Sequence, residues 1–248
     1  MDKVRQAATI VAGIVLVFLG ILNLVYRDSL MTWQPTPAGA SWTVPFAFLS
    51  GIILILGGLG LFLPQWRTKA AMLASGWIGL WALLLHLPHV VIAHDTGALL
   101  GLGEASANAL GLATLTGCFD SDRRALALRL GFGLCLVIFG VSHFVYADFT
   151  AQMVPAWLPQ RLGIAYLTGT IHALTGLCLL AGLRVRIAAT IEALMMSSFV
   201  LLLHIPGVAA APQDRLQLTM LGMASLLTCG AWLVASWPRL ERSTTARA

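Results

Sequence analysis

The chain has 248 residues, of which 58% are hydrophobic and 10% are charged, and its formal net charge is +5. Soluble domains carry about 25% charged residues, so this composition excludes a water-soluble globular protein. Its apolar runs have helical length, which also excludes the short alternating segments of an outer-membrane barrel. We therefore expect an all-α integral membrane protein with many spans.

Apolar segments follow one another along the chain with short polar connections. A helix needs about 20 residues to cross the hydrocarbon core of a bilayer, and most of the segments have this length. The fourth is the shortest, and its first residues are polar (Glu104, Ser106 and Asn108). We expect eight transmembrane helices, at 8–26, 43–63, 71–93, 104–119, 125–146, 161–182, 187–206 and 215–236.

Basic residues concentrate on one side of these expected spans. Because cytoplasmic loops are enriched in Lys and Arg, we place both termini in the cytoplasm. The opposite, outer side then keeps only Arg27, Arg161 and Arg215. The positive net charge follows from this topology, so we expect no nucleic-acid partner.

Parts of the first half recur in the second. Residues 20–28 resemble residues 140–148, an offset of 120, and LLLHLP at 83–88 recurs as LLLHIP at 201–206, an offset of 118. We expect two four-helix bundles, residues 1–119 and 120–248, related by a pseudo-two-fold axis along the membrane normal. The counterpart of the first span is internal, so we expect that span to be retained and not cleaved as a signal peptide.

Small and aromatic residues fit the same interpretation. Glycines such as Gly133, Gly169 and Gly176 allow close approach of helices, and the last two lie on about one helical face. Tryptophans are typical of membrane interfaces, and we expect five in such positions: Trp33, Trp42, Trp66, Trp157 and Trp237.

Residues 140–189 carry a recognisable pattern. A Gly-x-x-His at 140–143 precedes the loop VPAWLP at 154–159 and a small-residue helix that ends in a basic turn. This stretch resembles the first helix, outer loop and second helix of DoxX-family membrane proteins. The first half fits loosely, with Asn23 in place of His143, and the glutamate usual in the second helix of the family is replaced by His172. The resemblance implies a subunit that accompanies a redox enzyme, such as a thiosulfate:quinone oxidoreductase, or a thiol or oxidative-stress enzyme.

All six histidines fall in the outer half of the expected bilayer or beyond it. Polar groups inside a membrane cost free energy unless they are paired, and they often mark function. One carboxylate, Glu192, lies well inside a span toward its cytoplasmic end, where the first half has Ala74. The candidate outer-side polar cluster comprises His86, His89, His143, His172, His204, Tyr26, Tyr146, Asp28 and Asp148, and Glu192 is the candidate inner-side carboxylate.

Three interpretations of these residues stay open. The histidines could be interhelical hydrogen-bonding residues, with His86 and His204 donating to carbonyls freed by the following prolines or to the two aspartates. They could instead hold a quinone head-group or, with less support, a haem or a copper ion, since neutral imidazole is a common metal ligand. Thirdly, they could form a proton path with Glu192.

The sequence contains no nucleophile–base arrangement, no nucleotide-binding loop and no dense metal-ligand motif. We therefore assign no catalytic residue and no metal site, and we do not expect an autonomous enzyme. The expected function is a DoxX-type accessory, anchor or quinone-interacting subunit of a redox system in a bacterial inner membrane, which contacts membrane lipid and a redox-enzyme partner. A small-molecule or proton-coupled transporter and a structural scaffold are the alternatives, and homo-oligomerisation stays open.

Overall fold

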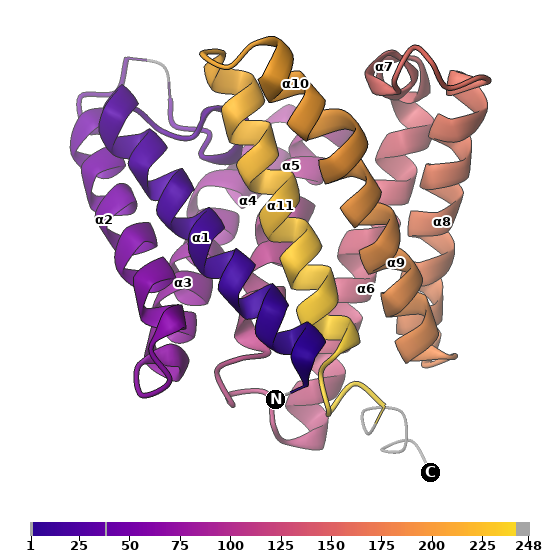
Figure 1. The fold of residues 1–248 in the computed structure, drawn as a ribbon, viewed down its shortest axis with the longest axis horizontal. Helices are drawn as coiled ribbons and strands as arrows, with labels where there is room; N and C mark the ends of the chain where they lie inside the picture. Colours follow the sequence, from indigo (N-terminus) through magenta and orange to yellow (C-terminus); the bar gives the residue numbers. More distant parts are fainter. Residues whose placement is uncertain (1, 38, 242–248) are drawn as a thin grey trace.

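The computed structural model describes residues 2–37 and 39–241. Within these two ranges all regular elements are helical (Figure 1). The long helices are α1 (Lys3–Tyr26), α2 (Thr43–Phe62), α3 (Arg67–Trp81), α5 (Thr96–Ala113), α6 (Asp122–Val145), α8 (Arg161–Ala181), α9 (Val185–Phe199) and α11 (Arg215–Ala235). The short elements are α4 (Leu87–Ala93), α7 (Ala147–Met153), α10 (Ile205–Ala210), the 3-10 turn η1 (Met31–Trp33) and the π-helical turns η2 (Ala82–His86) and η3 (Val200–His204).

In the described part of the chain, seven helices are long and apolar enough to cross a membrane. Two of them are composite rods, Arg67–Ala93 and Val185–Ala210, in which a π-helical turn joins two α-helices. These seven correspond to seven of the eight expected spans and confirm the multi-pass helical architecture. The remaining span was expected at 104–119, but α5 begins earlier because the Asp95 side chain caps it by accepting from the N–H of Ala98.

The helices form a closed ring (Figure 1). In chain order, α1 packs on α2, α2 on α3, α3 on α5, α5 on α6, α6 on α8, α8 on α9, α9 on α11, and α11 returns to α1. Inside the ring α5 and α11 contact each other, and a Cβ on Gly111 would overlap the backbone of Gly230. The crossing of these two helices therefore requires glycine.

Each half of the chain contains the same close helix pair. A Cβ on Gly20 of α1 would lie 2.6 Å from the carbonyl oxygen of Gly51 in α2. In the second half, a Cβ on Gly140 of α6 would lie 2.8 Å from the carbonyl oxygen of Gly169 in α8. These contacts confirm that glycines bring the helices together, as small residues do in membrane proteins.

Two buried apolar clusters lie side by side across the ring, and α11 contributes to both. Met223, Leu226 and Leu233 belong to the cluster built by α1, α2 and α3, whereas Leu227 and Val234 belong to the cluster built by α6, α8 and α9. Because one helix supplies both clusters, the two halves are interlocked.

Arginine side chains donate hydrogen bonds to carbonyls at helix ends on one side of the bundle. This is the end where α1 begins and α11 ends, here called the basic end. Arg129 Nη1 donates to the carbonyl of Leu179 near the end of α8 (2.6 Å), and Arg186 Nη1 donates to Ala235 at the end of α11 (2.9 Å). Arg5 donates to carbonyls near the ends of both α5 and α11. The last carbonyls of a helix lack intrahelical donors and carry partial negative charge, so these cations stabilise the helix ends.

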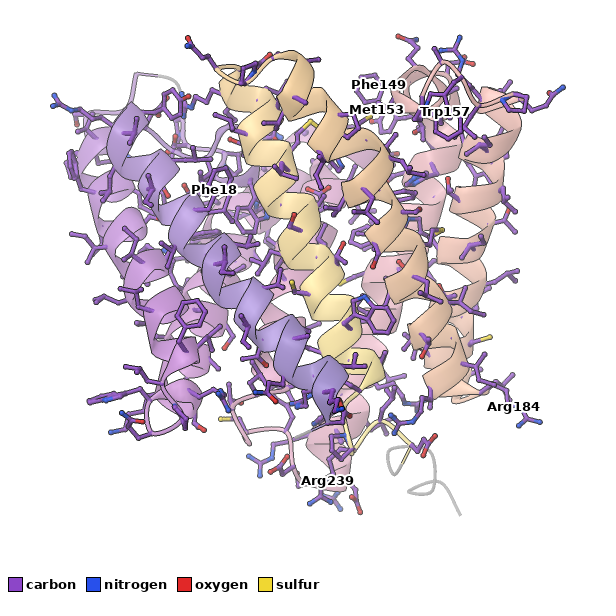
Figure 2. All side chains as sticks on the ribbon, in the orientation of Figure 1. Phe18, Phe149, Met153, Trp157, Arg184 and Arg239 are labelled. Carbon is purple, nitrogen blue, oxygen red and sulfur yellow. The ribbon has the colours of Figure 1, made fainter. Side chains whose placement is uncertain are left out.

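The opposite end of the bundle, here called the α7 end, has a different character. Figure 2 shows Phe149, Met153 and Trp157 together at this end, whereas Arg184 and Arg239 lie at the basic end. Phe149 is 63% and Trp157 71% exposed, as expected for aromatic residues at a membrane interface.

Two of the five tryptophans expected at an interface are buried instead. Trp42, Trp66 and Trp157 are exposed, but Trp33 is 0% and Trp237 2% exposed. Trp33 is buried because the segment that follows α1 turns back into the bundle, where η1 contacts both α5 and α11.

Candidate functional site

A histidine and a carboxylate meet between α8 and α9 in the second half. His172 Nδ1 lies 2.7 Å from Glu192 Oε1, and their side chains are 2% and 0% exposed. The two atoms are at ion-pair distance, although they are not aligned for a hydrogen bond. The other carboxylate oxygen accepts from Thr175 Oγ1 at 2.8 Å. Buried charges persist in proteins when they are paired in this way.

The contact brings together two residues that the sequence analysis kept apart. Glu192 was the candidate inner-side carboxylate and His172 a member of the outer-side cluster, and the two side chains lie against each other. Arg186 bonds to Glu241 and to the end of α11. Glu192 has the depth of His172 because α8 and α9 are antiparallel and both residues lie ten positions from the turn at Gly182.

His143 lies beside this pair. Its Nδ1 is 2.9 Å from the carbonyl oxygen of Phe139, one turn earlier in α6. Since a carbonyl only accepts, Nδ1 carries the proton and Nε2 of the neutral ring is an acceptor. The ring centroids of His143 and His172 are 4.8 Å apart.

Aromatic rings complete the surroundings of the two imidazoles. Phe199 of α9 lies 6.2 Å from the ring of His143 and 5.9 Å from the ring of His172, and Phe139 lies 5.6 Å from His172. The cluster of His143, His172, Glu192 and Thr175 with these two rings is called the His–Glu site below. The site combines hydrogen-bond donors and acceptors with flat aromatic rings inside the bundle.

Other members of the expected outer-side cluster lie elsewhere. Asp28 Oδ2 pairs with Arg215 Nη1 at 2.8 Å, and the Arg215 guanidinium lies 5.3 Å from the centre of the Tyr26 ring. Asp28 therefore joins α1 to α11. One interpretation expected it to accept from a histidine, but its partner is Arg215. His89, Tyr146 and Asp148 are exposed near the α7 end and do not join the His–Glu site.

His86 and His204 occupy the same place in the two composite rods, but their environments differ. His86 Nε2 lies 2.9 Å from the carbonyl oxygen of Trp33, which belongs to the connecting segment and is not a carbonyl freed by Pro88. His204 is 8% exposed and has no hydrogen bond to any residue that the structure describes.

A polar network in the first half was not anticipated. Gln34 is fully buried, accepts from Asn23 Nδ2 at 3.0 Å and from the Leu30 N–H at 2.8 Å, and donates to Ser50 Oγ at 2.6 Å. Trp77 Nε1 donates to the same Ser50 oxygen at 3.2 Å. One signal in the sequence could have indicated this network, because Asn23 stands at the position that corresponds to His143.

The donor set does not favour a metal centre. No group of three or more His, Cys, Asp or Glu side chains converges on one point in residues 2–37 and 39–241. In the His–Glu site the Glu192 carboxylate lies against the imidazole of His172 and accepts from the hydroxyl of Thr175.

Within the described residues, seven helices are long and apolar enough to cross a membrane, and an ionisable pair is buried between two of them; this combination is typical of polytopic α-helical membrane proteins. Residues 132–235 match the family model of a domain of unknown function (DUF8561). The matched part runs from α6 to the last residue of α11 and contains His143, His172, Glu192 and His204. No curated protein and no solved structure matches the chain.

Proposed function

We propose that the chain is a DoxX-type accessory subunit of a redox system in a bacterial inner membrane and that the His–Glu site binds the head-group of a quinone. The observation that carries the proposal is the buried contact of His172 with Glu192, with the His143 ring 4.8 Å from that of His172. Ionisable groups inside a membrane are costly and are typical of functional sites.

The chemistry of the site suits a quinone better than an ion. A quinone head-group is a flat ring with oxygens at opposite edges, so it needs apolar walls and hydrogen-bonding groups at its rim. Phe139 and Phe199 supply the walls, and His143 Nε2 supplies a hydrogen-bonding group that its own helix leaves free. The resemblance of residues 140–189 to DoxX proteins supports the redox setting.

The topology belongs to the same proposal. We infer that the basic end faces the cytoplasm, because Arg184 and Arg239 lie there (Figure 2) and cytoplasmic loops are rich in basic residues. The recurring glycine pairs and π-helical turns support two duplicated units related by a pseudo-two-fold axis. A redox-enzyme partner would then contact the subunit in the membrane or at its surface.

The test uses the full chain purified in detergent. A short-chain quinone analogue is titrated while its binding is followed by tryptophan quenching, and bound quinone is extracted and quantified. We expect saturable binding that His143→Asn weakens by about tenfold, the value of one hydrogen bond. The matched control is His89→Asn, an exposed histidine whose replacement leaves affinity unchanged.

Three results would overturn the quinone proposal. If the quinone analogue does not bind saturably to the chain, the proposal is wrong. A Soret band or stoichiometric copper in the purified protein replaces the quinone by a haem or a metal. Proton uptake by proteoliposomes that needs Glu192 and no quinone favours transport, which the direct contact of His172 with Glu192 also allows.

A further inference from the structure

Several landmarks recur in the two halves at nearly constant offsets along the chain. The π-helical turns η2 and η3 begin 118 residues apart, and His86 and His204 at their ends have nearly equal backbone angles (φ −78° and −77°, ψ −43° and −40°). Asp95 and Asp214, which are 119 residues apart, both cap the helix that follows them. Within a helix, the local offset assigns each position of one half a corresponding position in the other.

In the first half, the chain itself fills the space beside His86. Trp33 is fully buried, its ring meets that of Trp81 edge to face at 5.1 Å, and its carbonyl oxygen lies 2.9 Å from His86 Nε2. Gln34, the next residue, bonds to Asn23 and Ser50. Residues Trp33 and Gln34, called the plug below, thus present one flat ring, one carbonyl and one amide to the surrounding helices.

In the described part of the second half, no tryptophan or glutamine of the connecting segment is buried in this way, and the buried Val154 of this segment has neither an aromatic ring nor an amide side chain. The connecting segment forms α7, and Figure 2 shows Phe149, Met153 and Trp157 of this region at the α7 end of the bundle. Trp157 is 71% exposed, whereas Trp33 is 0% exposed. His204, the counterpart of His86, is nine-tenths buried and has no hydrogen bond within the described chain.

Three residues of the apolar cluster that contains Trp33 correspond to polar residues at the matching positions. His172 stands at the position of Leu54, and Glu192 at that of Ala74. Glu104 of α5 stands at the position of Met223, which shares a buried cluster with Trp33. The Glu104 carboxylate has neither a hydrogen bond nor an ion pair among the described residues, although it lies in the middle of a helix inside the ring.

We infer that the ligand of the His–Glu site occupies the position in the second half that the plug occupies in the first. Its flat ring takes the place of the Trp33 indole, and an oxygen on its rim takes the place of the Trp33 carbonyl and bonds to His204. Glu104, a residue of the first half, lines the same space. The inference rests on the proposed quinone function and makes the site a joint product of both halves.

The plug also indicates the chemistry of the ligand. The ligand must be planar and about the size of an indole. It must also carry hydrogen-bonding atoms at two edges, because Trp33 and Gln34 bond to partners on different helices. A quinone head-group has this form.

Photoaffinity labelling of the full chain tests the position directly. An azidoquinone is cross-linked to the protein in detergent, and the labelled peptides are identified by mass spectrometry, with excess unlabelled quinone as competitor. We expect labels near His204 and near Glu104 that the unlabelled quinone suppresses, and no label on residues 31–34, which contain the plug. The inference is wrong if the labels that unlabelled quinone suppresses are confined to other helices or lie at the plug.

Substitutions separate this inference from the proposed function. Glu104→Met introduces the residue of the corresponding position, Met223, which lies in one buried cluster with Trp33. His204→Phe removes the imidazole, and each variant should weaken quinone binding by about tenfold. His86→Phe, the matched control, removes the partner of Trp33 and should leave quinone affinity within about twofold. Size-exclusion chromatography shows which variants fold. If His204→Phe does not fold, the photoaffinity labelling tests the position of the ligand in its place.

The two proposals fail in different ways. If the quinone binds and His143→Asn weakens it, but Glu104→Met and His204→Phe leave affinity unchanged, the position inferred here is wrong and the proposed function stands. If no quinone binds to the unaltered chain, both are wrong.

Discussion

The first and second halves of the molecule use the same succession of helices but fill the space between them differently. In the first half, Trp33 and Gln34 turn back into the bundle and satisfy His86, Asn23 and Ser50. In the second half the connecting segment stays at the α7 end, and a buried imidazole–carboxylate pair lies between α8 and α9. One half is thus closed by its own chain, whereas the other keeps ionisable groups inside.

The residues at corresponding positions differ as well. Leu54, Ala74 and Met223 belong to the same buried apolar cluster as Trp33 of the plug. The corresponding positions carry His172, Glu192 and Glu104, and Glu104 belongs to the first half of the chain.

Removing the plug gives the largest expected effect. Trp33→Ala leaves an indole-sized cavity in the first half and should lower the free energy of unfolding by about 3–5 kcal/mol. Unfolding by SDS titration of the detergent-purified chain measures this, and added indole should restore part of the loss by binding the cavity. Trp157→Ala, at an exposed position, should change stability by at most about 0.5 kcal/mol. Equal effects of the two substitutions would refute the structural role of the plug.

Breaking the buried pair tests the other half. His172→Leu leaves the Glu192 carboxylate with Thr175 as its one partner in the described chain and should cost about 3–5 kcal/mol. The double variant His172→Leu/Glu192→Ala reproduces the apolar pattern of the first half and should recover most of that loss, since apolar groups can replace a buried pair. The same unfolding assay measures both. A double variant that is less stable than His172→Leu would show that the carboxylate does not depend on the imidazole.

The sequence predicted the spans well because their apolar length is a local property. It also brought His143 and His172 into one candidate cluster. It listed His172 and Glu192 separately, as an outer-side and an inner-side candidate, although counting ten residues on either side of Gly182 brings the two together. The burial of Trp33 could not be predicted in this way, since it depends on contacts of η1 with α5 and α11, which are far away in the chain.

The close helix pairs should respond alike in the two halves. A Cβ on Gly140 would lie 2.8 Å from both the Gly169 carbonyl oxygen and the Ala173 Cβ, so Gly140→Ala should cost about 1–3 kcal/mol by separating α6 from α8. Gly20→Ala should act similarly on α1 and α2. Gly76→Ala is the control, because no atom lies within 4 Å of a Cβ there. It should be neutral or stabilising by up to about 1 kcal/mol. If Gly140→Ala behaves like Gly76→Ala, the close approach of α6 and α8 does not hold.

The smallest effect is expected at the α7 end, where the halves also differ. Asp28 pairs with Arg215 at 2.8 Å, but its side chain is 44% exposed, so water and salt weaken the interaction. Asp28→Asn should therefore cost about 0.2–1 kcal/mol, and less at high salt. Asp148 occupies the corresponding position in the second half, is exposed and has no ion pair among the described residues. Asp148→Asn should leave stability unchanged, and an equal, salt-dependent loss in both variants would show that the contact of α1 with α11 through Arg215 is not specific to the first half.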